Sequence, residues 1–167
     1  MPLFKTDEEF LLQAYKKATE SPDPSTQNGA VIPFYHLGFE DYVEACNTFP
    51  NGVSNKPERL ERPLKYNFIE HAERNVLHEA LRRGVRTTGM TMFVPWFACA
   101  DCARAIIGAG ITKVVGHKRM FDQTPDHWKE SIAHAFVMFE EAGVETVLVS
   151  TVLNGPEIRF NGQLWKP

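Results

Sequence analysis

From Met90 onward, the sequence alternates between short β-type runs and stretches with apolar residues at helical spacing. Strands joined by helices of this length form right-handed crossovers, which cover both faces of a sheet. The alternation therefore predicts a three-layer α/β/α sandwich around a central mixed, largely parallel sheet. The predicted strands are residues 90–94, 113–116 and 144–149, and the predicted helices are residues 100–109 and 125–142.

The amino-terminal part predicts a helix and a hairpin. Apolar residues at helical spacing begin at Asp7 and stop at the proline-rich segment 21–24. Residues 29–34 and 42–47 predict two strands that are joined by a hairpin. Pro33 limits the first strand because a proline cannot donate to a strand ladder.

Residues 50–65 contain three prolines and few apolar residues, so they predict a long surface loop of the kind that often acts as a lid. Residues 69–83 then predict a helix that ends at Gly84. The tail, residues 151–167, favours an edge strand before Asn154.

Composition and charge limit the partners of the chain. Its 167 residues, 43% of them hydrophobic, fit a single domain over residues 1–167. The formal net charge of −3 gives no field that attracts nucleic acid, so a polynucleotide partner is disfavoured. No apolar run reaches the ~18 residues of a membrane span, and residues 1–7 lack the pattern of a signal peptide. We therefore expect a cytoplasmic protein that does not bind membranes.

Two short motifs have the chemistry of a metal site. Residues 71–73 read His-Ala-Glu, and Cys99 and Cys102 form a CxxC pair. In a reducing compartment such a pair indicates metal or redox chemistry rather than a structural disulfide. One imidazole and two thiolates can fill three corners of a zinc tetrahedron, so the fourth corner can hold a water whose pKa the metal lowers towards ~7. The motifs predict a hydrolytic Zn²⁺ site with Glu73 as a nearby carboxylate.

Both motifs must lie at helix starts for this site to form. On a regular helix His71 and Glu73 would point about 200° apart, so they converge only where the chain enters the helix. There the free amides and the positive end of the helix dipole favour a carboxylate. Cys99 and Cys102 fall at the start of the helix predicted over residues 100–109, where thiols deprotonate readily.

These motifs resemble those of the zinc-dependent cytidine and deoxycytidylate deaminase superfamily, and the deoxycytidylate deaminases are the finer match. Residues 23–30, DPSTQNGA, resemble the family segment DPSTQVGA, and residues 47–50 resemble NGxP. Residues 71–75 resemble HAExN, and residues 99–111 resemble CxxCAxxIIxAGI. The similarity runs from about residue 23 to residue 149 and implies a cytidine deaminase-like fold.

The resemblance implies hydrolytic deamination of a pyrimidine deoxynucleotide, dCMP to dUMP plus ammonia. His71, Cys99 and Cys102 would hold Zn²⁺. Glu73 would take a proton from the zinc water and return protons to N3 and to the leaving amine. Asn47 would hydrogen-bond the deoxyribose. The other expected substrate-binding residues are Ser25, Thr26, Gln27 and Ala72.

The resemblance further implies a homo-oligomer and regulation by dCTP and dTTP. The chain departs from the family pattern at several positions. Ala98 replaces the usual proline before the first cysteine, and residues 45–48 differ from the family's GYNG segment. Glu20 puts an acid before Ser21, where many members carry an arginine that could bind a phosphate. Asn28 replaces the usual valine of QVGA and adds a polar group beside the expected pocket.

Several alternatives stay open on the sequence alone. A CxxC pair after a strand and Trp96 also describes a thioredoxin-like dithiol. A zinc-stabilised binding module could use the same fold without catalysis, and an enzyme could act on another nucleoside, nucleotide or nucleic-acid base. A purely structural zinc would need a fourth ligand, for which the candidates are Cys46, His36, His78 and His117. Aromatic residues that could stack on a base are Tyr66, Phe68, Trp96 and Phe97, and a basic cluster interpreted as surface comprises Arg82, Arg83 and Arg86.

Overall fold

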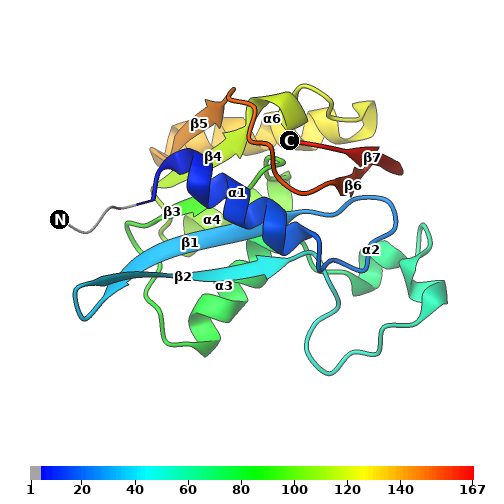
Figure 1. Ribbon diagram of the computed structural model, residues 1–167, viewed down its shortest axis with the longest axis horizontal. Helices are drawn as coiled ribbons and strands as arrows, with labels where there is room; N and C mark the ends of the chain where they lie inside the picture. Colours follow the sequence, from blue (N-terminus) through cyan, green and yellow to red (C-terminus); the bar gives the residue numbers. More distant parts are fainter. Residues whose placement is uncertain (1–4) are drawn as a thin grey trace.

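A mixed five-stranded sheet forms the centre of the computed structural model, which describes residues 5–167 (Figure 1). β1 pairs antiparallel with β2 and with β3, whereas β3–β4 and β4–β5 pair in parallel. The predicted α/β fold with a mixed sheet is confirmed, with two parallel and two antiparallel pairings. The spatial order of the strands is β2 (Phe39–Cys46), β1 (Gly29–His36), β3 (Thr91–Phe93), β4 (Lys113–His117) and β5 (Glu145–Val149).

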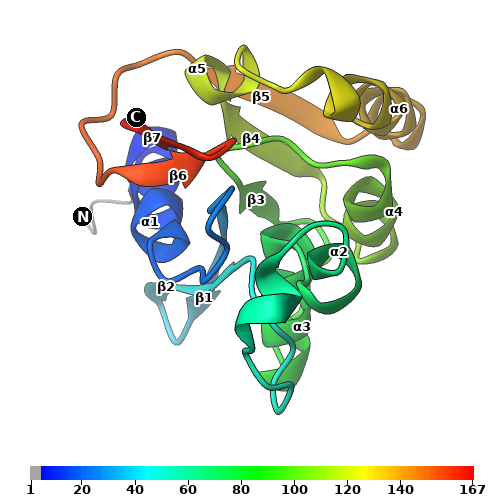
Figure 2. The ribbon, with the colours of Figure 1, turned by 90° about the vertical axis from the view of Figure 1, so that its right-hand side faces the viewer.

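Helices cover both faces of this sheet, which gives the predicted three layers (Figure 2). α1 (Asp7–Ala18) buries its apolar stripe against β1, β3 and β4 on one face. α3 (Ala72–Arg82), α4 (Ala100–Gly108) and α6 (Asp126–Ala142) enclose the larger core on the other face. Removing these apolar stripes from water is the main force that holds the layers together. No helix within residues 5–167 is long and apolar enough to cross a membrane.

α1 begins and packs through specific local contacts. Thr6 Oγ1 accepts a hydrogen bond from the backbone N–H of Glu9, and the Glu9 carboxylate accepts one from the N–H of Thr6, which forms a capping box. β1 starts directly against this helix. A Cβ on Gly29 would lie 2.0 Å from the backbone oxygen of Ala14, so this close approach requires glycine.

The β1–β2 hairpin is longer than the sequence predicts. Its pairing runs without a break from Gly29↔Cys46 to His36↔Phe39 and passes through Pro33. The strands reach the turn because Leu37 and Gly38 both have positive φ, 51° and 83°, the conformation that two-residue hairpin turns favour.

The segment between β2 and α3 contains two short helices that the sequence did not predict. η1 (Pro57–Leu60) lies within the predicted loop, and α2 (Lys65–Phe68) follows it. The predicted helix 69–83 therefore begins only at Ala72, since the chain leaves α2 in extended conformation at Ile69. α2 places Lys65 inside the protein, where it is 5% exposed.

The carboxyl-terminal tail forms a separate hairpin rather than an edge strand before Asn154, which corrects the prediction. β6 (Ile158–Phe160) and β7 (Gln163–Trp165) make a two-stranded sheet around the Asn161-Gly162 turn. Aromatic contacts hold this hairpin against α1 and the loop after β3, since Trp165 stacks on Tyr15 with ring centroids 5.6 Å apart and Phe160 meets Trp96 at 5.1 Å. A further short helix, α5 (Lys118–Phe121), follows β4.

Candidate metal and catalytic site

His71, Cys99 and Cys102 come together where α3 and α4 begin. His71 is the residue before α3, Cys99 is the residue before α4, and Cys102 lies in the first turn of α4. The Nδ1 atom of His71 lies 3.7 Å from the Sγ atom of Cys99 and 3.5 Å from that of Cys102. The predicted convergence of both motifs at helix starts is confirmed.

The geometry of these three side chains fits a tetrahedral zinc ion. With Zn–N of about 2.05 Å and Zn–S of about 2.3 Å, a tetrahedral nitrogen–sulfur edge measures about 3.6 Å. The two distances of 3.7 Å and 3.5 Å lie on either side of this value. Within residues 5–167, no other histidine, cysteine or acid joins the group, so these side chains would supply three of the four ligands of a zinc ion. Such a set is typical of catalytic rather than structural zinc.

The candidates for a fourth ligand lie elsewhere. Cys46 and His78 line a separate cavity. His117 is fully buried, with its Nδ1 2.7 Å from the Tyr15 hydroxyl and its Nε2 3.0 Å from the Thr151 carbonyl oxygen. His36 is exposed near the tip of the β1–β2 hairpin. The geometry therefore gives no support to a four-ligand structural zinc.

Glu73 is buried beside this cluster, in the first turn of α3. Burial raises the pKa of its carboxyl group, and the neighbouring His71 opposes the rise. A carboxyl group with a raised pKa gives up and takes back protons more easily near neutral pH, which suits a general acid and base.

The two thiols differ in acidity. A hydrogen bond from Cys102, assisted by His71, lowers the pKa of Cys99 to about 4. The same contact and burial raise the pKa of Cys102. Burial lowers the pKa of His71, but its contacts with Cys99 and Glu73 outweigh that effect and raise it. Cys99 is therefore the more acidic of the two thiols.

A pocket opens onto the cluster, and Trp128 forms one of its walls. The Trp128 ring meets His71, Trp96 and Tyr66 edge-on, with ring centroids 5.8, 5.9 and 6.5 Å apart. These aromatic faces and edges suit a planar heterocycle. The pocket is lined by Asp23, Thr26, Asn28, Asn47, Arg62, Lys65, Tyr66, Ile69, His71, Ala72, Glu73, Trp96, Phe97, Cys99, Trp128 and Ile132.

Asn47 supports the 26–28 loop, which forms another part of the pocket wall. Its Oδ1 accepts from the N–H of Asn28 at 2.8 Å, and its Nδ2 donates to the carbonyl oxygen of Thr26 at 2.8 Å. The side chain of Asn28 in turn bonds the backbone of Trp96 through both its oxygen and its nitrogen. Asn28, the polar residue that replaces the family's valine, therefore links the segment just before β1 to the loop before α4.

The structure does not bring every expected substrate-binding residue into the pocket. Thr26, Asn47 and Ala72 line it, whereas Ser25 reaches it only through a hydrogen bond with Arg62. Gln27 is not among the lining residues because its amide binds the Ser21 carbonyl oxygen and the Arg159 N–H. The hydrogen bond with Arg159 of the carboxyl-terminal hairpin thus holds the Gln27 side chain outside the pocket.

Glu20 and Phe68 lie outside the pocket, although the sequence suggested that each could be near it. Glu20 does not approach the pocket, because it forms an ion pair with Lys17 at 2.6 Å and lines the separate cavity. Phe68 faces Arg59 and is not a lining residue, whereas Tyr66, Trp96 and Phe97 are. The predicted surface cluster is exposed, as expected, at Arg82, Arg83 and Arg86.

Sequence reasoning missed six lining residues, which are Asp23, Arg62, Lys65, Ile69, Trp128 and Ile132. Trp128 and Ile132 come from α6, where their spacing indicates only a buried helix face. Arg62 and Lys65 come from the segment interpreted as a surface loop. No short motif or periodic pattern marks the position of the Arg62 and Lys65 side chains in the sequence.

Comparison with known proteins identifies the family. Residues 4–118 match the family model described as the cytidine and deoxycytidylate deaminase zinc-binding region. A protein of Aliivibrio fischeri described as an uncharacterized deaminase is 37% identical over 143 residues, which cover 81% of this chain and 88% of that protein. Deoxycytidylate deaminase of Mus musculus is 32% identical over 145 residues, covering 82% of this chain and 75% of the mouse protein.

Solved structures share the fold. The dCMP deaminase of the cyanophage S-TIM5 in its apo form superposes with a TM-score of 0.64 at 21% identity, covering 86% of this chain and 96% of that one. The same phage enzyme in complex with dCMP and dUMP gives a TM-score of 0.62 at 20% identity, covering 88% and 100%. The chain belongs to the cytidine and deoxycytidylate deaminase family of hydrolytic enzymes.

Proposed function

We propose that the protein catalyses the zinc-dependent hydrolytic deamination of a pyrimidine deoxynucleotide, dCMP to dUMP plus ammonia. The observation that carries this proposal is the placement of His71, Cys99 and Cys102 at tetrahedral ligand distances, beside a pocket that is lined by His71, Cys99 and the buried Glu73. The names of the mouse relative and of the phage enzyme support the choice of substrate.

His71, Cys99 and Cys102 would hold the zinc ion. When bound, zinc lowers the pKa of water to about 7 and so supplies a nucleophile near neutral pH. Glu73 would accept a proton from the attacking water and deliver protons to N3 of cytosine and to the amine that leaves C4. The carboxyl group lies close enough to interact electrostatically with His71 and Cys99, two of the proposed ligands.

The walls of the pocket would orient the substrate. The edges and faces of Trp128, Tyr66 and Trp96 would hold the cytosine ring against His71. Asn47 keeps one amide proton and one lone pair beyond its two hydrogen bonds, so it can bind a sugar hydroxyl while it braces the loop. Thr26 and Ala72 would complete this wall.

We also propose a homo-oligomer, a cytoplasmic location and control by dCTP and dTTP, which follow from the family resemblance. Sedimentation of the purified protein with and without each triphosphate tests the assembly. Rates with dCMP in the presence of each triphosphate test the control.

A side-by-side assay tests the proposed reaction. Zinc-quantified protein is offered dCMP, deoxycytidine, cytidine and dCTP, and loss of the cytosine chromophore is followed. Turnover that is fastest with dCMP supports the proposal. Turnover of only another substrate would keep the chemistry and replace the substrate, whereas no turnover of any of them with one zinc per chain would overturn it.

A further inference from the structure

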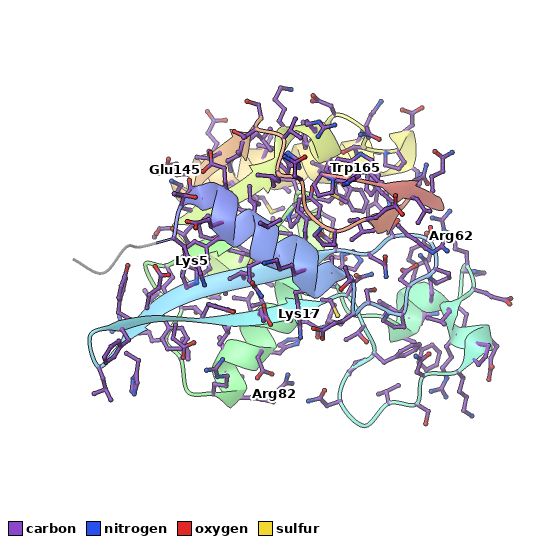
Figure 3. All side chains as sticks on the ribbon, in the orientation of Figure 1. Lys5, Lys17, Arg62, Arg82, Glu145 and Trp165 are labelled. Atoms are coloured by element: carbon purple, nitrogen blue, oxygen red, sulfur yellow. The ribbon has the colours of Figure 1, made fainter. Side chains whose placement is uncertain are left out.

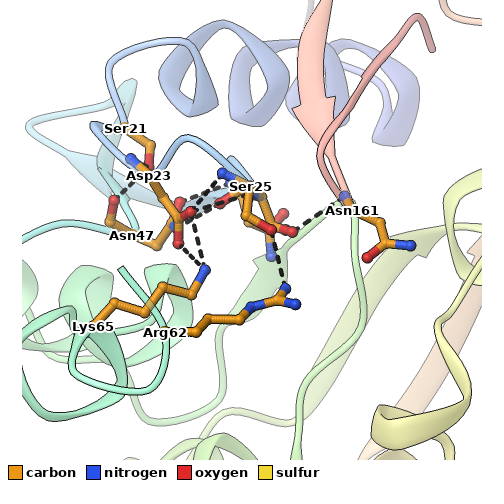
Figure 4. A network of polar contacts seen from close by, with 9 residues as sticks. Ser21, Asp23, Ser25, Asn47, Arg62, Lys65 and Asn161 are labelled. Carbon is orange, nitrogen blue, oxygen red and sulfur yellow. Dashed lines mark hydrogen bonds and ion pairs between the residues drawn. The ribbon is translucent and has the colours of Figure 1, made fainter. Parts of the chain in front are cut away.

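We propose that Arg62 binds the 5′-phosphate of the substrate at the mouth of the pocket and makes the site prefer a nucleotide to a nucleoside. This inference rests on the proposed function and adds the residue that selects the phosphorylated form. Two cationic side chains from one short segment, Arg62 and Lys65, line the pocket, and they point towards the 21–26 loop (Figure 4).

Lys65 is already neutralised. Its Nζ lies 3.0 and 2.9 Å from the two carboxylate oxygens of Asp23, and both side chains are buried, with 7% and 6% exposed. The same Asp23 carboxylate accepts the backbone N–H groups of Ser25 and Thr26. The charge of Lys65 and the backbone N–H groups of Ser25 and Thr26 are therefore already used by Asp23 and are not available to bind a phosphate.

The guanidinium group of Arg62 has N–H donors that are available to bind a ligand. Its Nη2 donates to the Oγ of Ser25 at 3.0 Å, which holds the guanidinium group at the pocket (Figure 4). Within residues 5–167, no carboxylate lies within ion-pair distance of Arg62. A guanidinium group carries five N–H donors in a planar fork that matches a phosphate, and the Ser25 hydroxyl can add a sixth. Arg62 thus offers both charge and geometry at this position.

Glu20, the acid at the position where many family members carry an arginine, does not repel a phosphate at this site. Glu20 pairs with Lys17 and lines the separate cavity. Figure 3 shows Arg62 at the edge of the molecule where the 50–65 segment lies, away from Lys17 and Arg82. The only acid next to Ser21 in the chain is thus turned away from the pocket, whereas Arg62 lines the pocket.

Arg62→Gln tests the proposal, because glutamine keeps a polar side chain but loses the charge and the fork. The matched control is Arg59→Gln, three residues earlier in the segment, since Arg59 binds the Ser54 carbonyl oxygen and covers Phe68 but does not line the pocket. The measured quantity is the ratio of kcat/KM for dCMP to that for deoxycytidine. Binding of dUMP and of deoxyuridine to the zinc-loaded proteins is measured by calorimetry alongside.

We expect Arg62→Gln to lower this ratio by at least about 10-fold through KM, as for loss of a charged hydrogen bond, and Arg59→Gln to leave it unchanged. The affinity for dUMP should fall by a similar factor relative to deoxyuridine. An unchanged ratio and an unchanged dUMP preference in Arg62→Gln would overturn the proposal, as would a wild-type protein that treats dCMP and deoxycytidine alike. If no substrate is turned over, the proposed function fails, and the dUMP binding data still decide the role of Arg62.

Discussion

The guanidinium group of Arg74 donates a hydrogen bond from Nη1 to the Sγ atom of Cys102 at 3.3 Å. Glu70 holds Arg74 in place, since its Oε1 accepts from Arg74 Nε at 2.6 Å and from the N–H of His71 at 3.0 Å. A fixed positive charge therefore lies beside one proposed zinc ligand and is tied to the backbone of another. Contacts of this kind orient metal ligands and stabilise thiolates.

Arg74→Met should weaken zinc binding by about 10-fold or more, because it removes the hydrogen bond to Cys102 and keeps most of the side-chain volume. Competition with a chromogenic chelator measures the affinity. Arg82→Met, on the exposed face of the same helix and paired with Glu79, is the control. Equal zinc affinities of the two variants would show that Arg74 does not support the site.

Lys65→Met should destabilise the protein by about 3 kcal/mol, because it leaves the buried carboxylate of Asp23 without its cation. Urea denaturation measures the free energy of unfolding. Lys118→Met removes an ion pair with Asp122 that is about half exposed, and it should cost less than about 1 kcal/mol. Similar costs for both variants would mean that burial of the Asp23–Lys65 pair has no energetic consequence.

Gly29→Ala should destabilise the protein by about 3 kcal/mol or more, since the new methyl group would meet the backbone oxygen of Ala14 at 2.0 Å and push β1 away from α1. Gly108→Ala serves as the control, because nothing lies within 4 Å of its Cβ and alanine favours the helix. Thermal unfolding of both variants should give a lower Tm only for Gly29→Ala. A wild-type Tm for that variant would contradict the close approach of β1 and α1.

His117 should make stability depend on pH. Burial lowers its pKa in the folded protein, whereas an unfolded histidine has a pKa of about 6.5. The unfolded chain therefore takes up the proton first as the pH falls, so the contribution of His117 is complete above about pH 7 and is lost as the pH drops below about 6.5. The difference in unfolding free energy between wild type and His117→Gln, measured from pH 5 to pH 8, should shrink towards acid pH. A difference that is constant over this range would be inconsistent with a buried neutral histidine.

The part of the site that could be predicted from the sequence is the part encoded by short, continuous motifs. The three proposed ligands and Glu73 belong to two short motifs at helix starts, and the position of each motif fixes the direction of its side chains. Trp128 was missed because it reaches the pocket only through packing of α6 on α4, which no short segment encodes. Arg62 was missed for a related reason, since a polar, proline-containing segment has no periodicity from which to place its side chains.

The carboxyl-terminal hairpin could have been predicted from its turn. Asn161-Gly162 is a strong signal for a two-residue hairpin turn, and both residues have positive φ, 50° and 79°. The flanking strands have only three residues each, too short for an alternation pattern to stand out. The place where they dock, on Tyr15 and Trp96, depends on aromatic contacts between segments far apart in the chain.

The zinc content and the deamination rate of Glu73→Gln, measured beside those of the wild type, test most directly whether this pocket is the catalytic centre. Glutamine has nearly the same shape but cannot move the protons, so we predict one zinc per chain in both proteins and a rate with dCMP that falls by at least about 10³-fold in the variant. A Glu73→Gln protein that binds zinc and deaminates dCMP at the wild-type rate would contradict the assignment of this pocket as the catalytic centre.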